Sequence, residues 1–345
     1  MVSIDIFKIN DNWDIGHTRR YIVEESKKLG FNSIELGEIS IVINELCTNF
    51  IKHNAVEGTL IFNILDEGGI VGIEITARDK GPGIEDVDKV IQDGVSSRGT
   101  MGGGFGALKR LMDSFEIYSN HIPGKFTHSK LDVGTLIILK KWASDKLKHT
   151  TDDIKVSLLS RPCAGVKANG DYYYIKKFKD KCIFAVIDGI GHGEEASSAS
   201  KLASKIIDNN THKSIKHILM AVNKELINTR GVVAGVVVVH TIKKEFEYAA
   251  VGNIEFRYIL NGTTKRFISS NGFLGGYPNC NIKVHKKIYE KNSVITMCTD
   301  GISNKWHYSS YLNIDLNNPA LLCNLILKDF GKNIDDATIL VSVLQ

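Results

Sequence analysis

The sequence predicts an α+β protein of two domains, and three observations support this. The 345 residues are enough for two ordinary domains. Residues 1–142 mix helical periodicity with long strands joined by a short turn, which favours an α/β sandwich of antiparallel strands over a parallel doubly wound sheet. Residues 154–345 alternate short β-branched strands with two helical stretches, which is typical of a β-rich sandwich with helices outside. The polar residues 143–153 between them are predicted to be a linker.

Periodicity and turn residues set the expected elements of the first domain. Apolar residues recur at helical spacing, and Gly30 is the expected C-terminal cap of the first helix. The expected helices cover residues 15–29, 33–53 and 108–115. The expected strands cover residues 60–65, 71–78 and 134–142, with a turn at 66–69.

The same rules apply to the second domain, where β-branched runs predominate. The expected strands cover residues 182–187, 232–240, 246–251, 256–260, 294–298 and 337–344. The expected helices cover residues 194–208 and 215–229.

Composition limits the functional classes. Hydrophobic residues make up 43% and charged residues 24%, as in a soluble globular protein. The chain has no apolar run of 18 residues and no leader pattern, so we expect neither a membrane span nor secretion. The six cysteines show no CxxC spacing, which favours reduced core cysteines and a cytoplasmic location. A net charge of +4 is too small to indicate nucleic-acid binding.

Three polar boxes follow one another in the first domain. Glu45 and Asn49 are four residues apart on an expected helix, so they share a face. Asn49 could offer an amide oxygen to Mg²⁺, and Glu45 could take a proton from a hydroxyl. Asp79 follows a strand, where its carboxylate could accept a hydrogen bond from an adenine amino group. Each box alone is weak evidence, because an exposed helix face or a turn explains it equally well.

Glycines complete these boxes. Gly81 and Gly83 allow close backbone approach to a base or ribose. The stretch 99–106 contains five glycines and leads directly into an expected helix, whose first N–H groups can bind phosphate. The order of the three boxes is much more specific than any one of them.

This pattern, with the run 76–86, the segment 93–97 and the residues 108–113, resembles the GHKL (Bergerat-fold) serine kinases of the RsbT type over most of residues 1–142. The resemblance implies an ATP-binding α/β sandwich that uses Mg²⁺ and phosphorylates STAS-domain switch proteins. It implies that Asn49 holds Mg²⁺, that Glu45 is the base and that Asp79 reads adenine. It assigns the phosphate lid to Gly102, Gly104 and Gly106. The stretch 120–132 is longer than the corresponding family turn.

Four acidic motifs punctuate the second domain. Asp171, Asp188, Asp300 and Asp335 each adjoin an apolar strand, and three of them lie beside a glycine. One Asp-Gly is usually a turn, but four in this arrangement are much harder to explain as turns. Two hard divalent ions about 3.5–4 Å apart need several carboxylates and can activate water.

These motifs resemble the PPM-family serine/threonine phosphatases of the SpoIIE and RsbX branch, with an αββα sandwich. The resemblance implies Mg²⁺ or Mn²⁺ bound by Asp171, Asp188, the Gly189 carbonyl, Asp300 and Asp335, with Asp188 and Asp300 central to catalysis. Asp336 is the less certain member of its pair. His192 is either a proton donor or a structural part of its turn. Arg161 either contacts phosphate as a fork donor or is simply exposed.

Two functions from different classes remain open. The first is a bifunctional regulator, with a kinase and a phosphatase acting on STAS-domain proteins of a partner-switching or stressosome-like pathway. The second is a phosphatase whose first domain only senses nucleotide or binds a partner in the manner of an anti-sigma factor. A scaffold with dead sites is disfavoured because all the acids are present. A histidine kinase is disfavoured because no phospho-accepting His helix precedes Glu45. A homodimer is expected only by analogy with related kinases.

Overall fold

The computed structural model describes residues 4–53, 55–67, 70–91, 104–119, 134–143, 154–166, 168–276, 281–311 and 318–345. The chain divides into two compact units, one formed mainly by residues 3–65 and 70–148 and the other mainly by residues 149–345. Most of the predicted linker, residues 144–153, lies outside the described residues. The domain boundaries at 142 and 154 therefore stay a prediction.

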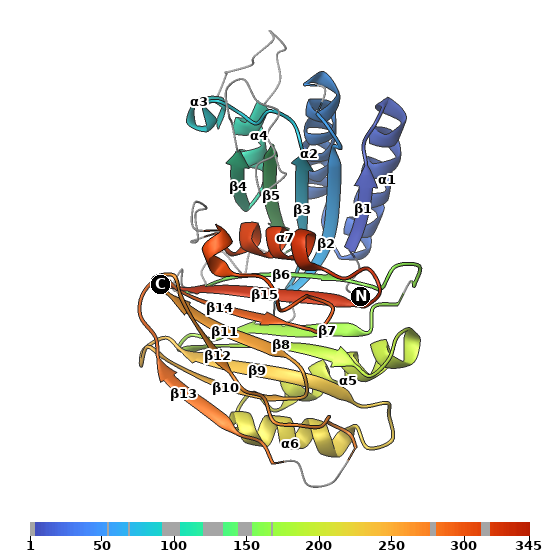
Figure 1. Cartoon of the computed structure of the whole chain (residues 1–345). Helices are drawn as coiled ribbons and strands as arrows, with labels where there is room; N and C mark the ends of the chain where they lie inside the picture. The colour runs from blue at the N-terminus through green and yellow to red at the C-terminus, as the bar shows by residue number, and fades with distance from the viewer. Residues whose placement is uncertain are drawn as a thin grey trace. The chain divides into compact units, whose positions relative to one another are not determined.

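The first unit is built on one five-stranded sheet in the order β1-β2-β3-β5-β4 (Figure 1). β1 pairs with β2, and β5 pairs with β3 and with β4, in each case antiparallel. The antiparallel sandwich expected from the sequence is thus confirmed. The strands are β1 (Ile4–Lys8), β2 (Thr59–Glu67), β3 (Ile70–Asp79), β4 (Ser114–Ser119) and β5 (Thr135–Trp142).

Helices α1 (Asn12–Lys28) and α2 (Ser33–Lys52) pack against each other and share a core with the sheet (Figure 1). Each begins with a capping box, in which the cap and the third helical residue satisfy each other's backbone donors. The helices α3 (Val87–Ile91) and α4 (Gly104–Leu111) are shorter.

The helix expected at 108–115 is wrong at both ends, because α4 starts earlier and Phe115 belongs to β4. The backbone N–H of Asp113 bonds to the Lys140 carbonyl of β5, so the chain has already joined the sheet there. The turn expected at 66–69 overlaps β2, which continues to Glu67, and residues 68 and 69 lie outside the described residues. Residues 93–97 and 120–132 lie outside the described residues.

The second unit contains two five-stranded antiparallel sheets with a core between them (Figure 1). One sheet has the order β13-β10-β9-β8-β7, and the other has the order β12-β11-β14-β15-β6. The first sheet contains β7 (Asp171–Lys177), β8 (Lys181–Gly189), β9 (Val232–His240), β10 (Glu245–Val251) and β13 (Val284–Ile288). The second contains β6 (Ile154–Arg161), β11 (Glu255–Leu260), β12 (Thr263–Phe267), β14 (Ser293–Cys298) and β15 (Ala337–Leu344).

Helices cover the outer faces of this sandwich. Helices α5 (Glu194–Asn209) and α6 (Ile215–Glu225) share a second core with the β7–β10 sheet. Helix α7 (Pro319–Phe330) packs on β6 and β15, and a 3-10 turn, η2 (Tyr308–Tyr311), precedes it (Figure 1). The αββα sandwich is therefore confirmed. The helix expected at 215–229 ends early, because the chain turns after Glu225 and the Thr229 N–H bonds to the Leu226 carbonyl.

The cysteines among the described residues carry no disulfide. Cys47, Cys182, Cys298 and Cys323 are buried thiols, as expected, and the Cys163 thiol is half-buried. In the described ranges, no helix is both long enough and apolar enough to cross a membrane.

Candidate nucleotide pocket and metal centre

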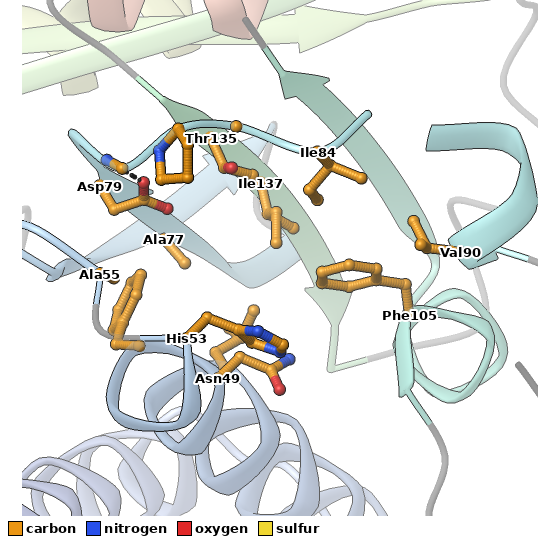
Figure 2. Close-up of a pocket in the computed structure, with 15 residues that line it drawn as sticks. Asn49, His53, Ala55, Ala77, Asp79, Ile84, Val90, Phe105, Thr135 and Ile137 are labelled. Atoms are coloured by element: carbon orange, nitrogen blue, oxygen red, sulfur yellow. Dashed lines mark hydrogen bonds between the residues drawn. The ribbon is translucent and has the colours of Figure 1, made fainter. Parts of the chain in front are cut away.

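The first unit has a cavity of about 330 Å³ between α2, the end of β3 and the start of α4 (Figure 2). Asn49 and His53 reach it from α2, Asp79 from β3 and Phe105 from α4. The rest of its lining is largely apolar: Leu46, Phe50, Ala55, Ala77, Gly81, Pro82, Gly83, Ile84, Val90, Thr135 and Ile137. An apolar cavity with few polar groups suits a planar base.

Asp79 is the acid of this pocket. Its Oδ1 accepts a hydrogen bond of 2.6 Å from the Gly81 N–H (Figure 2). Thr135, which pairs with Asp79 across β3 and β5, donates to it from its backbone and its hydroxyl. Burial raises the pKa of Asp79, and these hydrogen bonds oppose that rise. The carboxylate is thus fixed in an apolar pocket, where a polar ligand edge would gain most from it.

Glycines let the backbone close around this acid. A Cβ on Gly134 would lie 2.1 Å from the Gly81 carbonyl oxygen, so only glycine fits there. Gly83 has a φ of +79°, which favours glycine, and lines the cavity. Gly104 and Gly106 lie in the first turn of α4, and Gly102 lies outside the described residues.

Glu45 and Asn49 lie one turn apart on α2, as predicted. Asn49 lines the cavity, whereas Glu45 is half-buried and lies outside the cavity lining. The Asn49 amide therefore adjoins the cavity, and the Glu45 carboxyl group lies one turn earlier on α2. The role of Glu45 as a base stays a prediction.

Sequence reasoning missed His53, Phe105 and Thr135. His53 is the C-cap of α2, and Phe105 follows the predicted lid glycine. Thr135 was placed only in an expected strand. Its register opposite Asp79, which no local pattern reveals, brings it to the acid.

In the second unit, the register of β7 and β8 places Asp171 directly opposite Asp188. Asp171 is only 1% exposed. Its Oδ2 accepts a hydrogen bond of 2.8 Å from the hydroxyl of Thr299, the residue before Asp300. The Thr299 N–H in turn bonds to the carbonyl of Thr338 on β15. Both sheets therefore contribute to one carboxylate cluster.

Burial and mutual repulsion raise the pKa values of the carboxyl groups in this cluster. Burial, followed by the charges of Asp300 and Asp335, raises the pKa of Asp188 to about 8. Burial and Asp188 raise the pKa of Asp171 well above its ordinary range. Burial and Asp335 likewise raise the pKa of Asp300. Bringing these acids together is unfavourable unless positive charge joins them.

Asp335 and Asp336 are adjacent in the sequence, but their side chains lie in different environments. Asp336 is buried, and its two oxygens accept from the N–H groups of Cys163 and Gly170 at 2.8 and 3.1 Å. Asp335 has a side chain that is 30% exposed. Asp336 therefore holds neighbouring loops, and Asp335 is the more available ligand.

His192 and Arg161 lie beside the acids. His192 Nδ1 is 3.4 Å from Asp336 Oδ2 and 3.6 Å from Asp335 Oδ1. The Arg161 Nη2 donates to the Lys332 carbonyl at 2.8 Å. The roles of both residues in catalysis stay predictions.

Two glycines permit this crowding. Gly189 ends β8, and a Cβ there would lie 2.3 Å from the Ala196 carbonyl oxygen of α5. A Cβ on Gly301 would lie 1.9 Å from the Asp336 carbonyl oxygen. The glycines that follow Asp188 and Asp300 are thus required by close backbone contacts.

The residues present fit a metal ion. Within the described part of the chain, Asp171 Oδ1 is buried and has no hydrogen-bond partner. The centre also brings together several carboxyl groups, which are the oxygen ligands that Mg²⁺ and Mn²⁺ prefer. Asn253 Nδ2 donates to Asp300 Oδ2 at 2.7 Å and orients that carboxylate. Sequence reasoning missed Thr299 and Asn253.

Fold and sites together define an ATPase-type domain followed by a metal-dependent PPM-type serine/threonine phosphatase domain. The family model described as "Histidine kinase-like ATPase domain" matches residues 11–125, and that described as "Stage II sporulation protein E (SpoIIE)" matches residues 179–344. The chain belongs to these two families, as a fusion of a GHKL kinase-like domain with a SpoIIE-type phosphatase domain.

Two relatives from Bacillus subtilis (strain 168) match its two parts. Over 120 residues it is 36% identical to the serine/threonine-protein kinase RsbT, covering 35% of this chain and 88% of RsbT. Over 137 residues it is 30% identical to the phosphoserine phosphatase RsbX, covering 39% of this chain and 67% of RsbX. The recognition made from the motifs is confirmed.

Solved structures agree for the second unit. A crystal structure of RsbX in complex with magnesium is 25% identical, with a TM-score of 0.52, covering 57% of this chain and 98% of that one. A structure from work on the bacterial stressosome as a modular system that controls secondary messenger signalling is 26% identical, with a TM-score of 0.52. It covers 55% of this chain and all of that one.

Proposed function

We propose that this chain is a bifunctional regulator of a phosphorylated partner protein. Its first unit transfers phosphate from ATP to a serine, and its second removes phosphate from phosphoserine or phosphothreonine. The partner is a STAS-domain switch protein of a stressosome-like system, because the two parts of this chain resemble a kinase, RsbT, and a phosphatase, RsbX, which catalyse opposite reactions. The observation that carries the proposal is the presence of a nucleotide-type pocket and a carboxylate centre on one chain.

In the kinase reaction, each pocket residue has one task. Asp79 accepts a hydrogen bond from the adenine amino group, and Asn49 offers its amide oxygen to Mg²⁺. Glu45 takes the proton of the attacking serine hydroxyl. Gly102, Gly104 and Gly106 form the lid over the phosphates, where N–H groups at a helix start favour anions. When bound, Mg²⁺ neutralises phosphate charge.

In the phosphatase reaction, Mg²⁺ or Mn²⁺ would be held by Asp171, Asp188, the Gly189 carbonyl, Asp300 and Asp335. When bound, these ions supply Lewis-acid chemistry at the phosphoryl group. Thr299 holds Asp171 by a hydrogen bond. All-oxygen ligands suit both metals, so the ligand set does not choose between them.

The alternative is a phosphatase whose first unit only senses nucleotide, since opposed activities on one chain would cycle ATP without net effect. Glu45→Ala separates the two in an Asp188→Asn background, where phosphate cannot be removed. The assay follows labelled phosphate from ATP onto a STAS-domain protein, with Asn44→Ala, an exposed neighbour on α2, as the control.

If the chain is bifunctional, Glu45→Ala abolishes the labelling and Asn44→Ala keeps it. If Asp188→Asn alone never labels the partner, while wild type strips a pre-phosphorylated one, the first unit is a sensor.

A further inference from the structure

The guanidinium of Arg257 is buried beside the strand that leads to Asp300. Arg257 lies on β11 and is only 2% exposed. β11 pairs with β14, where Arg257 lies opposite Thr296, four residues before Asp300. Burying a charge is costly unless it is paired and hydrogen-bonded. The partners of this charge therefore indicate what it stabilises.

Those partners belong to the loop after Asp300. Arg257 Nη1 donates to the Trp306 carbonyl at 2.7 Å, and Nη2 donates to the Asn304 carbonyl at 2.8 Å. The guanidinium carbon also lies 3.6 Å from the centre of the Trp306 ring, and that ring is fully buried. Glu255 balances the charge, with Oε1 2.8 Å from Nη2. A planar fork that binds two carbonyls and stacks on a ring is specific to arginine.

This loop must hold Asp300 against the repulsion of its neighbours. Residues 299–307 contain no helix and pair with no strand beyond one isolated bridge, so the ladder of β14 does not fix them. Before Asp300, Thr299 bonds to Asp171 and to the Thr338 carbonyl. At and after Asp300, Lys332 donates to the carbonyls of Asp300 and Gly301, and Arg257 donates to the carbonyl of Asn304 further along the loop. Asp300 therefore lies on a short stretch of chain fixed on both sides.

We propose that Arg257 is a positioning residue for the metal centre. It fixes the loop through the carbonyls of Asn304 and Trp306, so that the Asp300 carboxylate stays where a divalent cation is bound. This inference rests on the metal site assigned under the proposed function. Residues hydrogen-bonded to a metal ligand typically change metal affinity about 10–100-fold when they are removed, and Arg257, which acts through the loop, is expected at the low end of that range.

The test measures Mn²⁺ affinity of the full, nucleotide-free chain by isothermal titration calorimetry. Arg257→Met removes the fork and the charge, and its apparent Kd should rise about tenfold or more. Arg257→Lys keeps the charge but reaches one carbonyl at a time, and its Kd should rise by roughly threefold. If Arg257→Met does not fold, Arg257→Lys decides, and an unchanged Kd overturns the proposal.

Two matched variants exclude a general loosening. Arg266 also touches the Asn304 carbonyl and Glu255, but its side chain is 52% exposed, so Arg266→Met should leave the Kd unchanged. Ile295→Val loosens the core of β14 without touching the loop. If it lowers both thermal stability and Mn²⁺ affinity as much as Arg257→Lys does, the proposal is wrong. Failure of wild type to bind Mn²⁺ at all would instead overturn the metal site itself.

Discussion

Removing the charge of Asp188 should stabilise the metal-free protein, and more so as the pH rises. Burial and neighbouring acids raise the pKa of Asp188 to about 8, against an ordinary value of 3.8. The folded state therefore keeps this proton between pH 4 and 8, while the unfolded state loses it. Stability from this group is present at low pH and is lost as the pH rises through that window.

The magnitude follows from the width of the window. Each pKa unit is worth about 1.4 kcal/mol, so three pH units between pH 5 and 8 give up to about 4 kcal/mol. The neighbouring acids titrate together with Asp188, so the proton is shared among them. We therefore expect the free energy of unfolding of Asp188→Asn, relative to wild type, to grow by about 2–4 kcal/mol over that range. The assay is urea unfolding in the presence of a chelator at pH 5, 6, 7 and 8.

Asp208 supplies a control of opposite sign. Its hydrogen bond from Lys176 lowers the pKa of Asp208, so Asp208→Asn should cost stability at neutral pH and less in acid. The reasoning would be refuted if the gain in unfolding free energy of Asp188→Asn over wild type were equal at pH 5 and pH 8. It would also be refuted if Asp188→Asn were less stable than wild type at pH 8. Saturating Mg²⁺ should stabilise wild type by about 2.7 kcal/mol at 100 times Kd, and Asp188→Asn by less.

Three further variants test the sites separately. Asp79→Asn removes the pocket charge and should weaken ATP binding about tenfold or more by calorimetry, because a charge-assisted hydrogen bond contributes about 1.5–3 kcal/mol; equal affinity would contradict this assignment. Gly134→Ala forces a Cβ against the Gly81 carbonyl and should also weaken ATP binding, with phosphatase activity retained on a small aryl phosphate. Gly301→Ala forces a Cβ against the Asp336 carbonyl, so phosphatase activity should fall while ATP binding is retained. Loss of both functions would show that this substitution disrupts the whole fold.

Local signals predicted most of the fold. Alternation and β-branched runs identified the central strands, and apolar periodicity identified α1, α2, α5 and α6. Helix α7 was missed because its residues are apolar on nearly every side, so no amphipathic period marks it. The strands β1, β4 and β6 were missed as well as β12 and β13, and the last two have largely exposed residues that lack a clear apolar face.

The motifs marked the acids as candidates, but they did not reveal the residues that contact them. The register of β7 and β8, which no local motif shows, places Asp171 opposite Asp188. Thr299 and Arg257 act through contacts between segments far apart in sequence, and these depend on register and loop path. A Thr before Asp300 was a visible signal, but nothing local shows that its hydroxyl reaches Asp171.

The central claim is that both units act on one partner protein. Wild type and Asp188→Asn would each be incubated with labelled ATP, Mg²⁺ and a STAS-domain protein, with and without Mn²⁺. The account predicts weak labelling by wild type and strong labelling by Asp188→Asn, because the phosphatase masks the kinase. Absence of labelling by both proteins would contradict it, and dephosphorylation of a pre-phosphorylated partner by wild type would then leave a phosphatase whose first unit only senses nucleotide.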